Sequence, residues 1–236
     1  MTIALLGADP ASAQVGIVIT SSSPAVAARC ARVLPGVGAA SSQNVTDPRL
    51  GPALLEELAA CGDVQTAIDS IRSANEQIEY RQLAIIDLAG KSAAWSGSGT
   101  LGNHAECHGE GCVAVGNLLA HEGVLNAATA AFTQAGGSLA TRLVTGLSAA
   151  TAAGGEAGPV RSAGLLIAAE VSWPVVDLRV DDHPEPLTEL ARLLELYEPL
   201  ALDYVQRARA PASAPAFGVP GDPGESADIG EPTDQN

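Results

Sequence analysis

The order of strand-like and helix-like segments is the feature of this sequence that most limits its fold. Groups of short β-like runs alternate with two pairs of adjacent amphipathic helices, one near 48–71 and one near 124–147. A helix pair returns the chain to the side on which it started, so it cannot supply the single crossovers of a doubly wound parallel sheet. The sequence therefore predicts an α+β protein built as a four-layer α-β-β-α sandwich.

Hydrophobic period and turn residues place the individual elements. Apolar runs bounded by Gly, Pro, Asn, Asp or Ser predict strands, which fall at 2–8, 14–20, 36–43, 80–87, 92–96, 113–119, 162–169 and 175–180. The Ala-rich stretch 25–34 predicts a short helix, and Asp63 is placed to cap the second helix of the first pair. Leucines at helical spacing predict a last helix at 187–197.

Chain length and a late change in composition set the domain boundaries. A chain of 236 residues is long enough for one sizeable core, which we expect to span residues 1–207. From 208 to 236 the apolar periodicity gives way to Pro, Ala, Gly, Ser and acidic residues. Such a segment buries too little apolar surface to order itself, so we expect a disordered tail.

Net charge, the first apolar run and the spacing of the cysteines limit the partners and the location that we expect. The net charge of −15 repels phosphate backbones and anionic membranes, so we expect a small-molecule substrate rather than nucleic acid or a membrane. The apolar run 2–8 has no basic residue before it and is broken by Asp9-Pro10, which favours a first strand over a signal peptide. The four cysteines form no dense framework. These features predict a cytoplasmic protein, which we expect to be a homodimer.

Three charged residues stand at alternate positions of a late predicted strand, on a face where apolar residues would be expected. They are Asp177, Arg179 and Asp181. They share one face at a strand's period of two, and charges on an inner face must be paired or functional. Arg179 would bind a substrate carboxylate with one aspartate holding its guanidinium, or all three would form a structural ion-pair network. His183 would transfer protons with Asp182, or bond to backbone at a helix entry.

Short motifs spread over residues 2–200 resemble one bacterial family. They are Ser22-Ser23-Pro24-Ala25-Val26, Gly36-Val37-Gly38-Ala39, Leu50-Gly51-Pro52, Arg81-Gln82-Leu83, Gly116-Asn117-Leu118-Leu119, Gly154-Gly155-Glu156 with Ser162-Ala163, and Asp177 to Pro184. With the start Met1-Thr2-Ile3, this order resembles the family catalogued as domain of unknown function 1028, usually placed in the N-terminal nucleophile (Ntn) hydrolase superfamily. The resemblance implies an Ntn-hydrolase-like fold. One departure is Arg161, where the family leads us to expect Gln.

The resemblance also implies a chemistry at the start of the chain. Ntn hydrolases use the side chain of the first mature residue as nucleophile and its α-amine as base, a place that Thr2 takes once Met1 is removed. Asn117 or Asn44 would donate to the oxyanion, although asparagines at strand ends also cap turns. We expect an amidohydrolase acting on a small amide or ureide, without cofactor or metal. The alternative is a non-catalytic ligand-binding or assembly protein that keeps Met1.

A second alternative is a zinc hydrolase. Four side chains of metal-binding type lie within nine residues, namely His104, Cys107, His108 and Cys112. Thiolate and imidazole are preferred tetrahedral zinc donors. Their spacing matches no established zinc pattern, and the family resemblance does not require a metal.

Overall fold

The structure, a computed structural model, describes residues 1–216. These residues form two compact units, one from Met1 to Glu198 and one that starts at Pro199. None of the helices in residues 1–216 has the length and apolarity that a membrane span requires.

The second unit is short within the described residues. It contains α7 (Ala201–Arg209), which buries none of its residues, and a 3-10 turn at Pro211–Ser213; another 3-10 turn, Glu198–Leu200, runs across the division between the units. The sequence did not predict α7, because it has no buried apolar stripe. The tail predicted from 208 begins inside α7, and its remainder, 217–236, lies outside the described residues.

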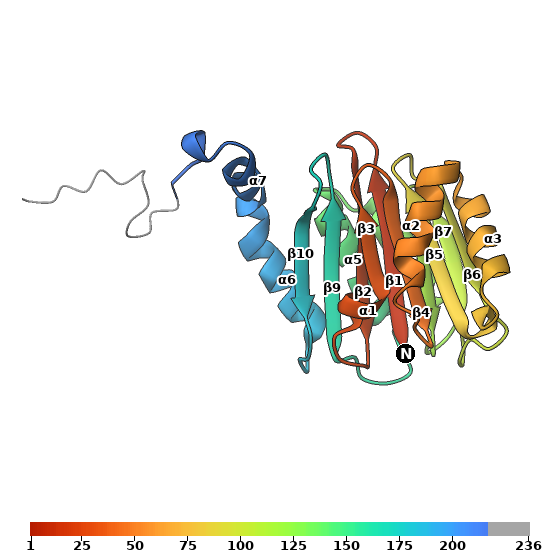
Figure 1. Ribbon diagram of the computed structural model, residues 1–236. Coiled ribbons are helices and arrows are strands. Elements are labelled where there is room, and N and C mark those ends of the chain that lie inside the picture. The colour runs from red at the N-terminus through yellow and green to blue at the C-terminus, as the bar shows by residue number, and fades with distance from the viewer. Residues whose placement is uncertain (217–236) are drawn as a thin grey trace, which may run out of the picture. The chain divides into compact units, whose positions relative to one another are not determined.

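A six-stranded antiparallel sheet forms one layer of the first unit (Figure 1). In spatial order its strands are β10 (Pro174–Val180), β9 (Ser162–Ala168), β2 (Gln14–Ser21), β1 (Thr2–Asp9), β8 (Cys112–Asn117) and β7 (Ala105–Gly109). β1 and β2 form the predicted hairpin, and β8 pairs with β1 on its other side. The first residues of the chain therefore start a central strand.

A four-stranded antiparallel sheet forms the facing layer. Its order is β3 (Ala31–Leu34), β4 (Gly38–Asn44), β5 (Arg81–Asp87) and β6 (Ser92–Ser96). Small apolar side chains from both sheets fill the space between them, and α1 (Val26–Cys30) packs into the same cluster.

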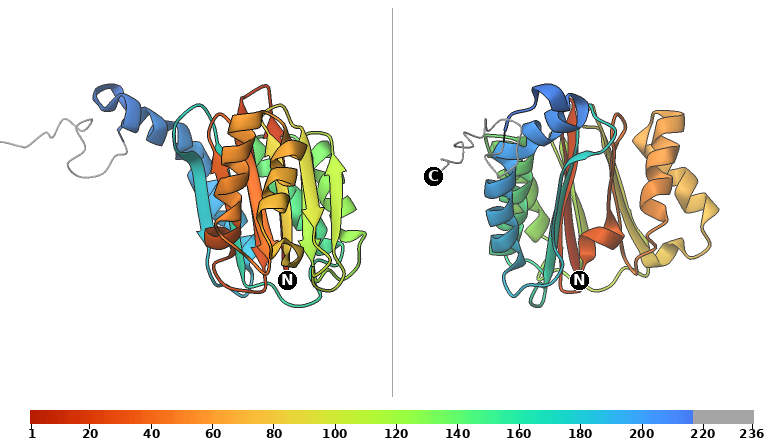
Figure 2. Two further views of the ribbon diagram at one scale, coloured as in Figure 1. Left: turned by 45° about the vertical axis from the view of Figure 1, so that its right-hand side comes forward. Right: turned by 60° about the vertical axis from the view of Figure 1, so that its left-hand side comes forward.

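Helices cover the outer face of each sheet, as the right-hand view of Figure 2 shows edge-on. α2 (Leu50–Cys61) and α3 (Val64–Ala74) share a core with the four-stranded sheet. α4 (Val124–Gln134), α5 (Leu139–Ala152) and α6 (Pro186–Tyr197) share a core with the six-stranded sheet. Strand β1 is buried on both faces, because Ile3 and Leu5 join the helical core while Ala4 and Leu6 join the core between the sheets. The predicted α-β-β-α layering is confirmed.

Two local predictions differ from the structure. The stretch 25–34 is helical only through Cys30, because residues 31–34 instead pair with β4 as β3. Strand β7 was not predicted; it is an edge strand with Glu106 and His108 among its residues, so it lacks a continuous apolar face. The predicted cap of α3 is confirmed, since the side chain of Asp63 accepts a 2.8 Å hydrogen bond from the backbone of Thr66.

Candidate active site

Thr2 begins the central strand and is enclosed by polar residues from the neighbouring strands. In the sheet register it lies opposite Ser21 at the end of β2 and opposite Asn117 at the end of β8. All three side chains are buried, with Thr2 6% and Asn117 1% exposed. Polar side chains buried at one end of a sheet need hydrogen-bond partners. Thr2 and Ser21 find theirs at the start of the chain, and Asn117 finds one on the second sheet.

The hydroxyls of Thr2 and Ser21 converge on one carbonyl oxygen. The Oγ1 of Thr2 donates to the carbonyl of Met1 at 2.6 Å, and the Oγ of Ser21 donates to the same oxygen. The two hydroxyl oxygens are 3.3 Å apart. The Met1 carbonyl, which is attached to the nitrogen of Thr2, therefore lies beside two hydroxyl groups that donate to its oxygen.

Glu156 is a buried acid close to this cluster. Its side chain is 7% exposed, and its Oε2 accepts a 3.2 Å hydrogen bond from the backbone of Ser22. Burial raises the pKa of the Glu156 carboxyl to about 7, while the positive charge of the chain's α-amine acts to lower this pKa. Glu156 belongs to the Gly-rich motif 154–156, and the sequence alone predicts no role for it.

Two buried glutamines connect the site to the second sheet. Gln43 on β4 and Gln82 on β5 are paired in register, and the Gln43 amide donates to the Oε1 of Gln82 at 2.9 Å. Asn117 donates to the same oxygen at 3.1 Å, and Gln82 itself donates to the carbonyl of Gly116 at 3.0 Å. Sequence reasoning missed both glutamines, although a glutamine inside an otherwise apolar strand is the signal that could have found them.

The two asparagines predicted as oxyanion donors occupy different positions relative to Thr2. Asn117 lies beside Thr2, with one of its amide hydrogen bonds directed to Gln82. Asn44 adopts a positive φ of 79°, donates to the carbonyl of Tyr80 at 2.7 Å and accepts from the backbone of Leu101 at 3.2 Å. Asn44 thus holds a turn through backbone contacts, and only Asn117 is next to the hydroxyl cluster.

The predicted substrate-binding residues of β10 lie away from Thr2. Arg179 makes a two-oxygen contact with Asp181 at 2.8 and 3.1 Å, and Asp177 is exposed on the same strand. β10 is at the sheet edge, three strands from β1, which corresponds to about 14 Å. The side chain of Arg179 is 41% exposed, so these charges need no buried partner. The structure pairs them with one another but does not bring them to the Thr2 cluster.

His183 and Asp182 do not form the expected pair, because each binds another partner. The Asp182 carboxylate accepts two hydrogen bonds from Arg161, at 2.8 and 2.7 Å. The Nδ1 of His183 accepts a 3.0 Å hydrogen bond from the backbone of Glu185, just before α6. This is the helix-entry arrangement that the sequence analysis gave as the alternative.

The four side chains considered for zinc do not converge. Cys107 hydrogen bonds to Asn126 on α4, whereas the next residue, His108, points to the opposite face of β7 and contacts β6. Burial raises the pKa of the Cys112 thiol to about 11, which disfavours the thiolate that zinc needs. Among the described residues, no group of three or more His, Cys, Asp or Glu side chains is arranged to hold a metal ion.

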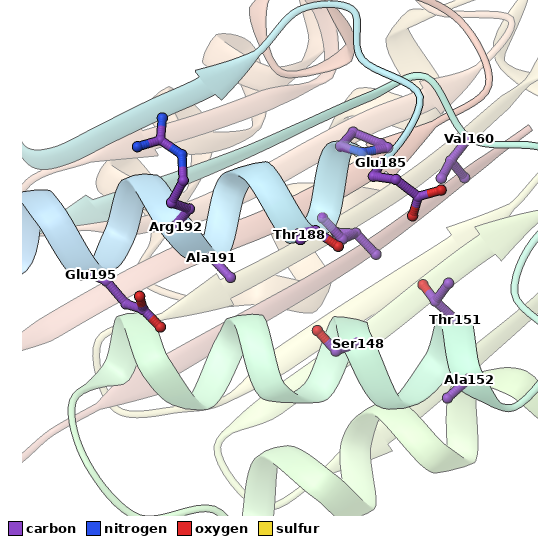
Figure 3. A pocket seen from close by; sticks show the side chains of 11 residues that line it. Ser148, Thr151, Ala152, Val160, Glu185, Thr188, Ala191, Arg192 and Glu195 are labelled. Carbon is purple, nitrogen blue, oxygen red and sulfur yellow. The ribbon is translucent and has the colours of Figure 1, made fainter.

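A separate cavity of about 660 Å³ lies between α5 and α6 (Figure 3). Ser148 and Thr151 of α5 face Thr188 and Ala191 of α6 across it, and neither Thr2 nor Glu156 lines it. The cavity therefore belongs to the outer helical layer and not to the site at the start of β1.

Comparison with known proteins identifies the chain's family. The model of the family of unknown function DUF1028 matches residues 2–190. The chain belongs to this family. A crystal structure of a DUF1028 protein, SPO2555 from Silicibacter pomeroyi, is 28% identical over 87% of this chain and 90% of that one, with a TM-score of 0.79. Among curated proteins, none matches the chain.

Two proteins called Anbu are more distant structural neighbours of this DUF1028 protein. Anbu (ancestral β-subunit) from Yersinia bercovieri is 11% identical over 87% of this chain and 97% of that one, with a TM-score of 0.40. Anbu from Hyphomicrobium sp. strain MC1 is 11% identical over 93% of this chain and 100% of that one, with a TM-score of 0.37.

Proposed function

We propose that this protein is an N-terminal nucleophile amidohydrolase acting on a small amide, with Thr2 as nucleophile after removal of Met1. The observation that carries the proposal is the position of the Thr2 hydroxyl, which begins a central strand and lies 2.6 Å from an acyl oxygen beside Ser21. The α-β-β-α layering and the family resemblance to Ntn hydrolases support it. An α-amine has a pKa near 8, so it can take a hydroxyl proton near neutral pH.

The reaction would proceed through an ester on Thr2. The Thr2 oxygen adds to the substrate carbonyl carbon while the α-amine takes the hydroxyl proton; the C–N bond then breaks, and the amine passes this proton to the leaving nitrogen. Water attacks the ester with the α-amine again as base, releasing the carboxylic acid and the free hydroxyl. Ser21 and Asn117 are the nearest side-chain donors for the oxyanion.

A kinetic comparison of Thr2 variants tests this proposal. Thr2→Ala should lower kcat/KM for small amides by about a thousandfold or more, because the hydroxyl that forms the ester is lost. Thr2→Ser keeps the hydroxyl and the amine and should retain measurable turnover. Thr145→Ala, on an exposed position of α5, is the matched control. Undiminished turnover by Thr2→Ala would contradict the proposal.

A non-catalytic protein that retains Met1 is the second candidate, and one observation favours it. The Met1 carbonyl is bonded by both Thr2 and Ser21, and the Met1 side chain packs against Gly158, where a Cβ would come within 2.9 Å of Met1 Cε. Met1 is thus well accommodated at the chain start. Retained Met1 would block the α-amine, so the mass of the N-terminus separates the two candidates.

A further inference from the structure

Met1 occupies the space next to the Thr2 hydroxyl in the manner of an acyl group. Its carbonyl oxygen accepts from Thr2 and Ser21, and its side chain extends to Gly158. A substrate acyl group bound to the Thr2 oxygen would have to occupy part of the same space, because that oxygen is only 2.6 Å from the Met1 carbonyl oxygen. Removing Met1 therefore leaves room for a group of similar size.

The loop that contains Glu156 crosses the start of β1. On one side, Glu156 forms a β-bridge with Leu119, just after β8, and Ala157 donates to the carbonyl of Leu118 at 2.9 Å. On the other side, the Glu156 carboxylate binds the backbone of Ser22, just after β2. Since β8 and β2 flank β1, the loop passes beside Met1, which is half-buried.

One oxygen of the Glu156 carboxylate is buried without a hydrogen-bond partner among the described residues. A buried carboxylate oxygen left unpaired is costly, so such an atom marks a place where a donor is missing. The positive charge that acts on Glu156 is the α-amine of Met1. With Met1 in place this amine forms neither a hydrogen bond nor an ion pair with Glu156, so the unpaired oxygen stays open to another donor. Met1 thus presents an acyl oxygen at Ser21, a side chain at Gly158 and an amine whose charge acts on Glu156.

We propose that the space vacated by Met1 is a subsite for an α-aminoacyl group, with Glu156 receiving the substrate's free amine and Ser21 donating to its carbonyl oxygen. The inference rests on the proposed function and narrows its substrate class to amides of amino acids with an unblocked amine. An ammonium donor satisfies the unpaired carboxylate oxygen, and a compact apolar side chain fits against Gly158.

A binding experiment tests the subsite without requiring catalysis. The protein is the full chain carrying Thr2→Ala, with loss of Met1 verified by mass, and the probes are L-methioninamide and its des-amino analogue 4-(methylsulfanyl)butanamide. By calorimetry, L-methioninamide should bind at least about tenfold more tightly than the analogue. Equal affinities, or no binding of L-methioninamide at millimolar concentration, would overturn the proposal.

The role of Glu156 is tested in the same background. Glu156→Gln should weaken L-methioninamide binding about tenfold or more and leave the analogue unchanged, whereas the exposed control Glu170→Gln should change neither. An equal loss for both probes would contradict the assignment to Glu156.

Hydrolysis of the same two amides by the protein with native Thr2 separates the two proposals. Selective binding of L-methioninamide without hydrolysis of either amide would contradict Thr2 as nucleophile and support the aminoacyl subsite. Hydrolysis of only the des-amino analogue would support Thr2 as nucleophile and contradict the aminoacyl subsite.

Discussion

At the scale of single residues, Glu156 is a buried acid with few partners for its charge. Its carboxyl is buried, one oxygen has a single backbone donor, and the other has none among the described residues. Burial of a carboxylate with so few partners favours the protonated form, which accounts for the raised pKa of about 7. A buried group whose pKa is shifted in this way is a candidate for a functional site.

Glu156→Gln should stabilise the protein at neutral and alkaline pH. The folded pKa of about 7 lies above the ordinary value of 4.5, so the native state binds more protons between these values and the free energy of unfolding falls as pH rises through them. The lost stability amounts to about 3 kcal/mol above pH 7. Thermal or urea unfolding at pH 5 and pH 8 checks this. A variant no more stable than the parent at pH 8 would refute the burial argument.

The sequence predicted some members of the site and missed others for a physical reason. Thr2 and Asn117 stand at strand ends, so their places in the hairpin and in β8 could be predicted from apolar period alone. Gln43 reaches Thr2, and Gln82 reaches Gln43, only through pairing between distant segments. Glu156 reaches Ser22, next to the hydroxyl cluster, only through loop 154–158. Local patterns do not encode such pairings.

At the scale of elements, close approach of α5 to the six-stranded sheet fixes the helical layer. Gly146 faces β1 and α4, and a Cβ there would lie 2.5 Å from Leu5 Cδ2 and 2.9 Å from the carbonyl of Ala128. The helix can pack this closely only because position 146 has no side chain. Helix periodicity predicted α5 itself but could not predict which of its positions touches the sheet.

Gly146→Ala should destabilise the protein by about 1–3 kcal/mol, because overpacking against backbone outweighs the gain in helix propensity. Gly136→Ala is the matched control, since a Cβ at Gly136 meets no atom within 4 Å. The midpoints of urea unfolding measure both effects. Equal midpoints for the two variants would contradict the packing assigned to α5.

Gln82→Leu tests the connection between the two sheets. It removes the acceptor of Asn117 and the shortest of the three acceptors of Gln43. One buried donor is thus left unpaired, which should cost about 1–3 kcal/mol. Exposed Gln134 on α4 offers the control, Gln134→Leu, with a change near zero. If both variants unfold at the same urea concentration, the glutamine chain makes no contribution to stability.

At the scale of the whole molecule, the core is complete within the first unit. All buried hydrophobic residues lie in the chain before Pro199 among the described residues, and α7 buries none. The layered fold could be predicted because two helix pairs and two strand groups permit few arrangements. The boundary expected at 208 from composition falls inside α7, whereas the first compact unit ends at Glu198.

Truncation after Arg209 should leave the thermal midpoint of the first unit unchanged to within about 2 °C, because none of the described residues that it removes, 210–216, is buried. Differential scanning calorimetry of the full and truncated chains measures this. A drop of more than about 5 °C would mean that the removed segment packs on the first unit.

The intact mass of the native protein tests the central claim most directly. The account requires a free α-amine on Thr2, since the hydroxyl beside it has no base while Met1 remains attached. Mass spectrometry of the purified full chain should therefore show a species that lacks the mass of one methionine residue. A protein found only with Met1 in place would contradict the nucleophile and leave the non-catalytic candidate.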